Sequence, residues 1–217
     1  MACQICETRK EKRFCPAVHG RICAVCCGTE REVTLDCPSD CPYLRQARER
    51  EKPRALNQLD PAEVFAEVEI RDALLHQREP LIVGLSFALA KSARAERSLV
   101  DRDLIGALSA LARRYQTLAS SGLITGTEQG LGPQQAIVAE LEKMIAGYRE
   151  TEQKHVGYAT LRDSEVLEAL VFLVRMAQAR TSGRPKSRAF LDFLYSRFPE
   201  KEPAIVAPDA GRSIVIP

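Results

Sequence analysis

No stretch of this sequence is apolar over the length of a membrane-spanning helix, which needs about 20 residues. The longest apolar run, residues 81–90, covers roughly half of that length and contains Gly84 and Ser86. The opening stretch MACQICETRKEKR also lacks the apolar centre of a secretory signal peptide. We therefore expect a cytoplasmic protein with no membrane partner.

A large excess of charge of one sign is missing as well. The 217 residues carry 31 basic and 29 acidic side chains, a net charge of +2. This balance argues against a whole-surface attraction to nucleic acid, although it leaves room for a local basic patch. The sequence also lacks a Ser/His/Asp set, a phosphate-binding loop and an H-E-x-x-H motif. We therefore expect that the protein is not an enzyme.

Cysteine is absent after residue 41, and all eight cysteines lie before that point. In a chain without a secretory signal, such a cluster is more typical of a metal site than of a disulfide framework. The shift in composition predicts three parts: a zinc-binding module over residues 1–43, a helical domain over 44–198 and an extended C-terminal tail over 199–217. A module of about 40 residues buries too little apolar surface to fold alone, so bound metal would dominate its stability.

The cysteines are spaced as C-x2-C-x8-C-x7-C-x2-CC-x9-C-x3-C. Two C-x2-C pairs at this separation indicate zinc, because each pair can hold one ion from a tight turn and Zn²⁺ takes four tetrahedral thiolate or imidazole ligands. We predict two structural zinc ions. The ligands of the first ion would be Cys3, Cys6, Cys23 and Cys26. The ligands of the second would be Cys15, Cys27, Cys37 and Cys41, with His19 as the alternative to Cys27.

The doublet Cys26–Cys27 favours this division. Adjacent side chains in an extended or turn conformation point in opposite directions, so the two thiols could serve ions on either side of one segment. The alternative with His19 leaves one thiol free. An iron–sulfur cluster also takes four thiolates, and a thiol near Arg21 and Arg31 could be redox-active. The short paired spacings favour zinc over an iron–sulfur cluster. The redox interpretation is disfavoured because zinc-bound thiolates are largely protected.

The candidate ligands form four short pairs along the sequence. If the first pair shares one zinc ion with the third, and the second pair shares another with the fourth, the order resembles the cross-brace or treble-clef arrangement of the HIT and MYND zinc fingers. The matching pairs are Cys3 with Cys6, Cys15 with His19, Cys23 with Cys26 or Cys27, and Cys37 with Cys41. The second pair has three intervening residues instead of two, and the final His of those families is missing. The sequence pattern CP-x3-G-x-IC-x2-CCG also resembles the N-terminus of small uncharacterised bacterial proteins. The resemblance covers about the first fifth of the chain and implies a role in binding a protein partner.

Two basic stretches provide an alternative function, nucleic-acid binding. The loop between the second and third cysteines is basic and ends in Phe14, and such a loop can contact phosphate. Its cations are Arg9, Lys10, Lys12 and Arg13. The stretch RPKSR precedes a predicted helix start, a geometry suited to an anion. Its candidate anion-binding residues are Arg184, Lys186, Ser187 and Arg188. The main hypothesis remains a zinc-binding protein that engages a protein partner.

The rest of the chain has the apolar periodicity of helices and predicts a mainly α fold, a bundle of about six helices behind the zinc module. Proline, acidic and capping residues mark the helix starts. The predicted helices cover residues 43–52, 60–76, 80–95, 104–122, 133–148, 163–181 and 187–198. The tail ends in SIVIP after spaced prolines, so we expect it to be extended, with residues 214–216 docked in an apolar groove.

Overall fold

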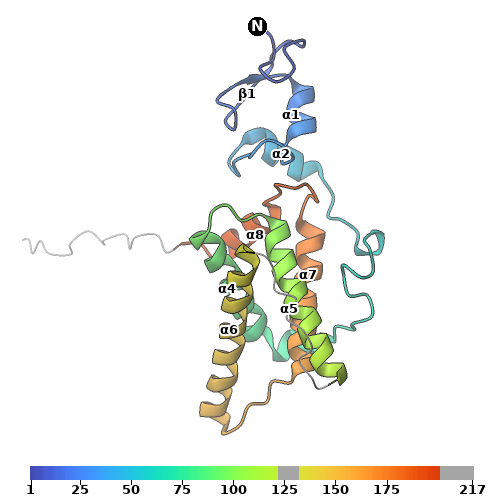
Figure 1. The fold of residues 1–217 in the computed structure, drawn as a ribbon, viewed down its shortest axis with the longest axis vertical. Coiled ribbons are helices and arrows are strands. Elements are labelled where there is room, and N and C mark those ends of the chain that lie inside the picture. The colour runs from blue at the N-terminus through green and yellow to red at the C-terminus, as the bar shows by residue number, and fades with distance from the viewer. Residues whose placement is uncertain (122–131, 201–217) are drawn as a thin grey trace, which may run out of the picture.

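The computed structural model describes residues 1–121 and 132–200. A small Cys-rich module precedes a helical domain, and the two lie end to end (Figure 1). The mainly α fold confirms the prediction, and six helices follow the module within the described residues. These helices are α3 (Asp72–Gln77), α4 (Glu79–Ala95), α5 (Asp101–Ser121), α6 (Pro133–Val156), α7 (Asp163–Arg180) and α8 (Ala189–Arg197). The expected docking of residues 214–216 falls outside the described residues.

The Cys-rich module is built on a hairpin and two helices. The strands β1 (Arg13–Cys15) and β2 (Gly20–Ile22) pair antiparallel, and they are followed by α1 (Ala24–Glu30) and α2 (Pro42–Arg50). The N-terminal loop packs on the hairpin, where a Cβ at Gly20 would fall 1.5 Å from the side-chain oxygen of Gln4. A larger residue at position 20 would therefore displace the end of the exposed Gln4 side chain.

The buried cluster of this module contains little besides sulfur. Apart from five cysteines, it consists of Ile22 and Leu35. Two aliphatic side chains are far too few to offset the conformational entropy lost on ordering such a module. The packing therefore indicates that the cysteines themselves must contribute to its stability.

The core of the helical domain is centred on α7. This helix packs along α5, while α4 packs along α6 (Figure 1). The buried apolar residues of α7 run around most of its circumference, as expected of a central helix. They are Val166, Leu167, Ala169, Leu170, Val171, Leu173, Val174 and Ala177. None of the helices in the described ranges combines the length and hydropathy that a membrane-spanning segment requires.

The predicted helix over residues 60–76 is wrong in its first part, because residues 61–67 form turns. The buried Phe65 has a φ of 50°, which is incompatible with a right-handed helix. Arg175 on α7 donates hydrogen bonds to the backbone carbonyl oxygens of Phe65 and of Val64, the latter at 2.8 Å. A residue distant in sequence thus binds carbonyl oxygens that a helix in this segment would use for its own hydrogen bonds.

Candidate metal centre

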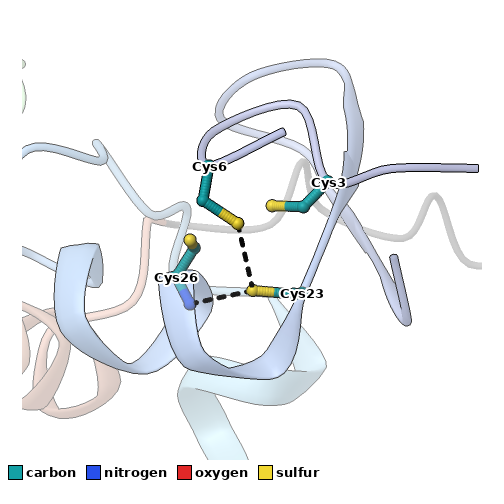
Figure 2. A group of neighbouring side chains, drawn as sticks. All are labelled: Cys3, Cys6, Cys23 and Cys26. Carbon is teal, nitrogen blue, oxygen red and sulfur yellow. Dashed lines mark hydrogen bonds between the residues drawn. The ribbon is translucent and has the colours of Figure 1, made fainter. Parts of the chain in front are cut away.

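Four cysteines of the module converge on one point (Figure 2). The sulfur atoms of Cys3, Cys6, Cys23 and Cys26 all lie within 4.8 Å of one another. Those of Cys6 and Cys23 are 4.0 Å apart. A tetrahedral zinc–thiolate site with bonds of about 2.3 Å has sulfur–sulfur edges of about 3.8 Å. This four-cysteine group could therefore hold a metal ion without rearrangement of the backbone, and all eight cysteines of the chain are free.

Two tight backbone turns bring these sulfurs together. In the N-terminal loop, the amide of Ile5 donates to the sulfur of Cys3 at 3.5 Å. At the start of α1, Cys23 is the N-cap residue, and its sulfur accepts from the amide of Cys26 at 3.4 Å. Each C-x2-C pair therefore directs backbone N–H groups at its own sulfur atoms, an arrangement that favours the thiolate form.

Two thiols of this group, Cys6 and Cys26, differ strongly in pKa. The Thr8 hydroxyl, followed by the amides of Arg9 and Thr8, lowers the pKa of Cys6 to about 5. Burial, reinforced by contacts with the neighbouring thiols, raises the pKa of Cys26 to about 12. Four adjacent thiolates repel one another, so the last of them ionises only with difficulty. A divalent cation reverses that balance and releases the remaining protons when it binds.

The other four cysteines line a single small cavity of about 10 Å³. They are Cys15, Cys27, Cys37 and Cys41. The volume is about that of one water-sized probe, so it has room for a single atom. Burial raises the pKa of the Cys37 thiol, although a hydrogen bond with the Glu32 backbone acts in the opposite direction. The alternative ligand His19 lies elsewhere, exposed in the turn between β1 and β2 with a φ of 50°.

The adjacent Cys26 and Cys27 point toward different sets of cysteines, as predicted. The geometric reason is not the extended conformation expected from the sequence. Cys26 and Cys27 both lie in α1, not in an extended segment. Adjacent residues of a helix are rotated by about 100° relative to each other. This rotation turns Cys26 toward the first group and Cys27 toward the second cavity.

Arginine side chains surround the sulfur atoms. Arg13 donates to the sulfur of Cys27 at 3.4 Å and stacks over the Tyr43 ring at 4.5 Å, and Arg31 approaches the same sulfur at 4.0 Å. The pKa of Arg9 is raised, mainly by its contact with the sulfur of Cys23. Arg9 and Arg13 of the predicted basic loop thus contact cysteine sulfurs, and Arg9 is exposed like Lys10 and Lys12.

The predicted anion-binding residues 184–188 lie against the rest of the chain. Arg184, Lys186 and Arg188 all donate to backbone carbonyl oxygens, and the buried Ser187 donates to a carboxylate. The acceptors are Gly28 and Arg31 for Arg184, Thr34 for Lys186, Arg97 for Arg188 and Asp101 for Ser187. Anion binding at this loop stays a prediction, and the contacts to residues 28–34 attach the helical domain to the Cys-rich module.

Sequence reasoning missed the residue at the centre of that attachment. Glu32 is only 2 % exposed, and its backbone has a φ of 54°. Its carboxylate accepts from Arg48 at 2.7 Å and from the Ser182 hydroxyl at 3.0 Å, and its carbonyl oxygen accepts from the amide of Lys186 at 2.8 Å. In the sequence, nothing distinguishes Glu32 from the neighbouring Glu30, because all three partners are distant along the chain.

The described part of the chain therefore holds one four-cysteine group that could bind a metal ion, while the other four cysteines lie around a small cavity among mostly apolar side chains. Comparison of the chain with known protein families, with curated proteins and with solved structures finds no match.

Proposed function

We propose that this is a zinc-binding protein in which structural metal ions hold a small module that engages a protein partner. The observation that carries the proposal is the approach of four cysteine sulfurs to within 4.8 Å of one another. Four protein thiolates fill the tetrahedral shell of zinc and leave no position for a substrate or water, as in structural sites. The proposed role is therefore not enzymatic.

A second zinc ion is part of the proposal. The small cavity lined by Cys15, Cys27, Cys37 and Cys41 supports it, and Cys27 is the proposed fourth ligand in preference to His19. This division assigns Cys3, Cys6, Cys23 and Cys26 to one ion and Cys15, Cys27, Cys37 and Cys41 to the other, so the ligands of the two ions interleave along the chain. The same interleaving supports a cross-brace module of the kind found in HIT and MYND fingers.

The charges around the sulfurs also suit zinc. A Zn²⁺ ion with four thiolates carries two net negative charges, which are costly to bury without compensation. Arg9 faces the first group, while Arg13 and Arg31 contact Cys27 in the second. These guanidinium groups supply compensating positive charge at both sites.

The proposed protein-binding role is supported by exposed apolar side chains on the Cys-rich module. Six of the eleven large hydrophobic side chains that are exposed among the described residues lie within the first 33 residues. They are Met1, Ile5, Phe14, Val18, Val25 and Val33. Such a concentration on a small unit is typical of a surface that a protein partner covers.

Nucleic-acid binding has weaker support. It depended partly on cations of the N-terminal loop, and two of these contact cysteine sulfurs: Arg13 donates to Cys27, and Arg9 contacts Cys23. Guanidinium groups engaged in this way are less available to phosphate.

The metal content of the full chain tests the proposal. Purified without air, it should contain two zinc ions, each with four sulfur neighbours at about 2.3 Å in X-ray absorption. Cys6→Ser and Cys41→Ser each remove one ligand of a different site, so each should lower the content to one ion per chain. His76→Ala, an exposed histidine of the helical domain, is the control and should retain both ions. Iron in place of zinc, or full zinc content in both cysteine variants, would overturn the proposal.

The partner role needs a separate experiment. The zinc-loaded chain is used for affinity capture from a cell extract, and the captured proteins are compared with those bound by Phe14→Ser and Val25→Ser. Both changes should reduce capture of the same proteins, because these side chains are 56 % and 49 % exposed on the module. Phe87→Ser is the control, since Phe87 is 51 % exposed on the helical domain. Equal capture by all variants would contradict a docking role for the module.

A further inference from the structure

A large cleft lies in the helical domain, away from the cysteines. Its volume is about 760 Å³, and it is lined by α5, the end of α7 and the loop that follows α7. Arg54, in the segment between α2 and α3, closes one side. This volume falls in the range of about 300–1,000 Å³ that is typical of small-molecule sites.

The lining of this cleft is strongly basic. Four arginines line it, namely Arg54, Arg102, Arg113 and Arg184, against a single carboxylate, Glu63. The chain as a whole is almost balanced, with 31 basic and 29 acidic residues. The excess of positive charge is therefore a local property of this hollow, where it creates a favourable potential for an anion.

Polar groups at the base of the cleft hold one arginine in place. The Arg54 side chain donates to the Gln178 amide oxygen at 3.5 Å, and the Arg54 backbone amide donates to the Ala179 carbonyl at 3.1 Å. Gln178 and Thr181 are 8 % and 6 % exposed. Both residues line the cleft, so a ligand inside it could contact their side chains. Gln134, at the start of α6, also lines the cleft.

Small residues keep the cleft open. Gly106, Ser109 and Ala110 form one face of α5 along it. A Cβ at Gly106 would lie 2.8 Å from the Gln134 side-chain nitrogen. Gly183 has a φ of 72°, and a Cβ there would lie 3.2 Å from the Arg54 guanidinium. Larger residues at these glycines would thus push into the side chains that line the cleft.

We propose that this cleft binds a small, multiply charged phosphate ester of about nucleotide size. Guanidinium groups pair with phosphate oxygens through parallel hydrogen bonds, and they do so better than lysine because of their planar fork. The glutamine amides can both donate and accept, which suits the polar remainder of such a ligand. The site lies outside the metal centre and does not depend on the proposed zinc function.

A small ligand fits better than a nucleic-acid strand. Strand-binding proteins use an extended basic groove with aromatic side chains on which bases stack. Here the cations gather around one hollow, and its lining contains no aromatic residue in the described part of the chain. Arg184 also donates to the carbonyl oxygens of Gly28 and Arg31 in the Cys-rich module. A bound phosphate would therefore share this arginine with the attachment between the two domains.

Titration calorimetry of the full, zinc-loaded chain with pyrophosphate and with ATP tests the proposal. We expect saturable binding of at least one probe. Arg102→Gln should weaken it about tenfold, the loss expected for one charge-assisted hydrogen bond to phosphate. Arg102 is exposed on α5, so this change should spare the fold, and unchanged zinc content and thermal unfolding verify that. Arg50→Gln, an exposed arginine on α2, is the matched control and should bind like the original chain.

Three results would overturn the proposal. The first is the absence of saturable binding of both probes at millimolar concentration. The second is equal binding by the Arg102→Gln and Arg50→Gln variants. The third is that a single-stranded oligonucleotide binds more tightly than either probe, and that its affinity falls steeply with salt in the original chain but less steeply in Arg102→Gln. The cleft would then be part of a strand-binding surface. If the purified chain binds ATP but contains no zinc, the proposed metal function is contradicted and the proposed phosphate site is not.

Discussion

The carboxylate of Glu32 accepts a hydrogen bond from the guanidinium of Arg48 at 2.7 Å, in a position where Glu32 is only 2 % exposed. Arg48 on α2 also pairs with Asp192 on α8. The other oxygen of Glu32 accepts from the Ser182 hydroxyl at 3.0 Å. One buried carboxylate thus joins the Cys-rich module, α2 and the segment after α7, and it makes the orientation of the module depend on a charge network.

Replacing this carboxylate should destabilise the protein. Glu32→Gln keeps the side-chain shape but leaves the Arg48 guanidinium with only Asp192 as a charged partner. Removing one member of a buried ion pair costs about 3 kcal/mol. Urea unfolding should show that loss in the free energy of unfolding. Glu49→Gln, on the exposed face of α2, should change it by less than about 0.5 kcal/mol. Equal effects of the two changes would show that the buried network contributes nothing.

A pair of alanine variants tests the fourth ligand of the proposed second zinc ion. Cys27 lines the small cavity with Cys15, Cys37 and Cys41, whereas His19 is exposed outside it. Cys27→Ala should therefore lower the zinc content from two ions to one, and it should lower the melting temperature of the module. His19→Ala should retain both ions. The reverse pattern would assign the imidazole as the ligand and leave Cys27 as a free thiol.

The helices of the bundle could be predicted because their signals are local. The start of α6 at Pro133 and of α7 at Asp163 agree with the sequence prediction, since proline and acidic residues act on the first turn of a helix. The convergence of Cys3, Cys6 and Cys23 follows from equally local C-x2-C turns and from the ligand rules of zinc. Each of these inferences needs no knowledge of the tertiary fold.

The features that could not be predicted depend on contacts between distant segments. Glu32 meets Ser182 across 150 positions of the sequence, and Arg54 meets Gln178 across 124. Arg184 of the RPKSR loop donates to the carbonyl oxygens of Gly28 and Arg31 across 156 and 153 positions. Neither composition nor periodicity encodes which carbonyl an arginine will reach, because that depends on how the helices pack.

Acid should weaken the helical domain through a second charge cluster. Glu152 accepts from Arg78 at 2.6 Å and from the Thr160 hydroxyl at 2.6 Å, and the amides of Thr160 and Leu161 each donate to it at 2.9 Å. Burial on its own would raise the pKa of Glu152, but these donors outweigh it and lower the pKa. The pKa of Glu165 is lowered in the same way, by the Arg162 amide and by Arg78 against the effect of burial.

The sign of the pH effect follows from these directions. Since the unfolded chain binds protons at the ordinary glutamate pKa of about 4.3, the stabilisation is complete above that pH. It is lost as the pH falls through the lowered values of the folded state. Glu152→Gln should cost about 2 kcal/mol at pH 7, and this difference should shrink in urea unfolding below about pH 4. Glu150→Gln, exposed on the same helix, should leave the acid dependence unchanged. A deficit of Glu152→Gln that is constant with pH would contradict the ionic origin of the effect.

Arg175 should determine whether residues 61–68 keep their turns. Its guanidinium donates to the carbonyl oxygens of Val64, Phe65 and Val68. Arg175→Met retains most of the side-chain length but removes every donor, so the free energy of unfolding should fall by about 3 kcal/mol, as hydrogen bonds from a charged group are lost. Amide hydrogen exchange should accelerate over residues 61–68 and stay unchanged in α5, because only the turns lose their partner.

A matched change separates this effect from the mere loss of a surface charge. Lys154→Met removes a cation from an exposed position on α6 and should alter neither stability nor exchange. If Arg175→Met lowered stability while residues 61–68 exchanged at their original rate, the turns would be held by the burial of Phe65 alone. If exchange instead slowed there, the freed carbonyls would have entered the helix that the sequence favours. That result would show that a single guanidinium overrides the helix-start signal of this segment.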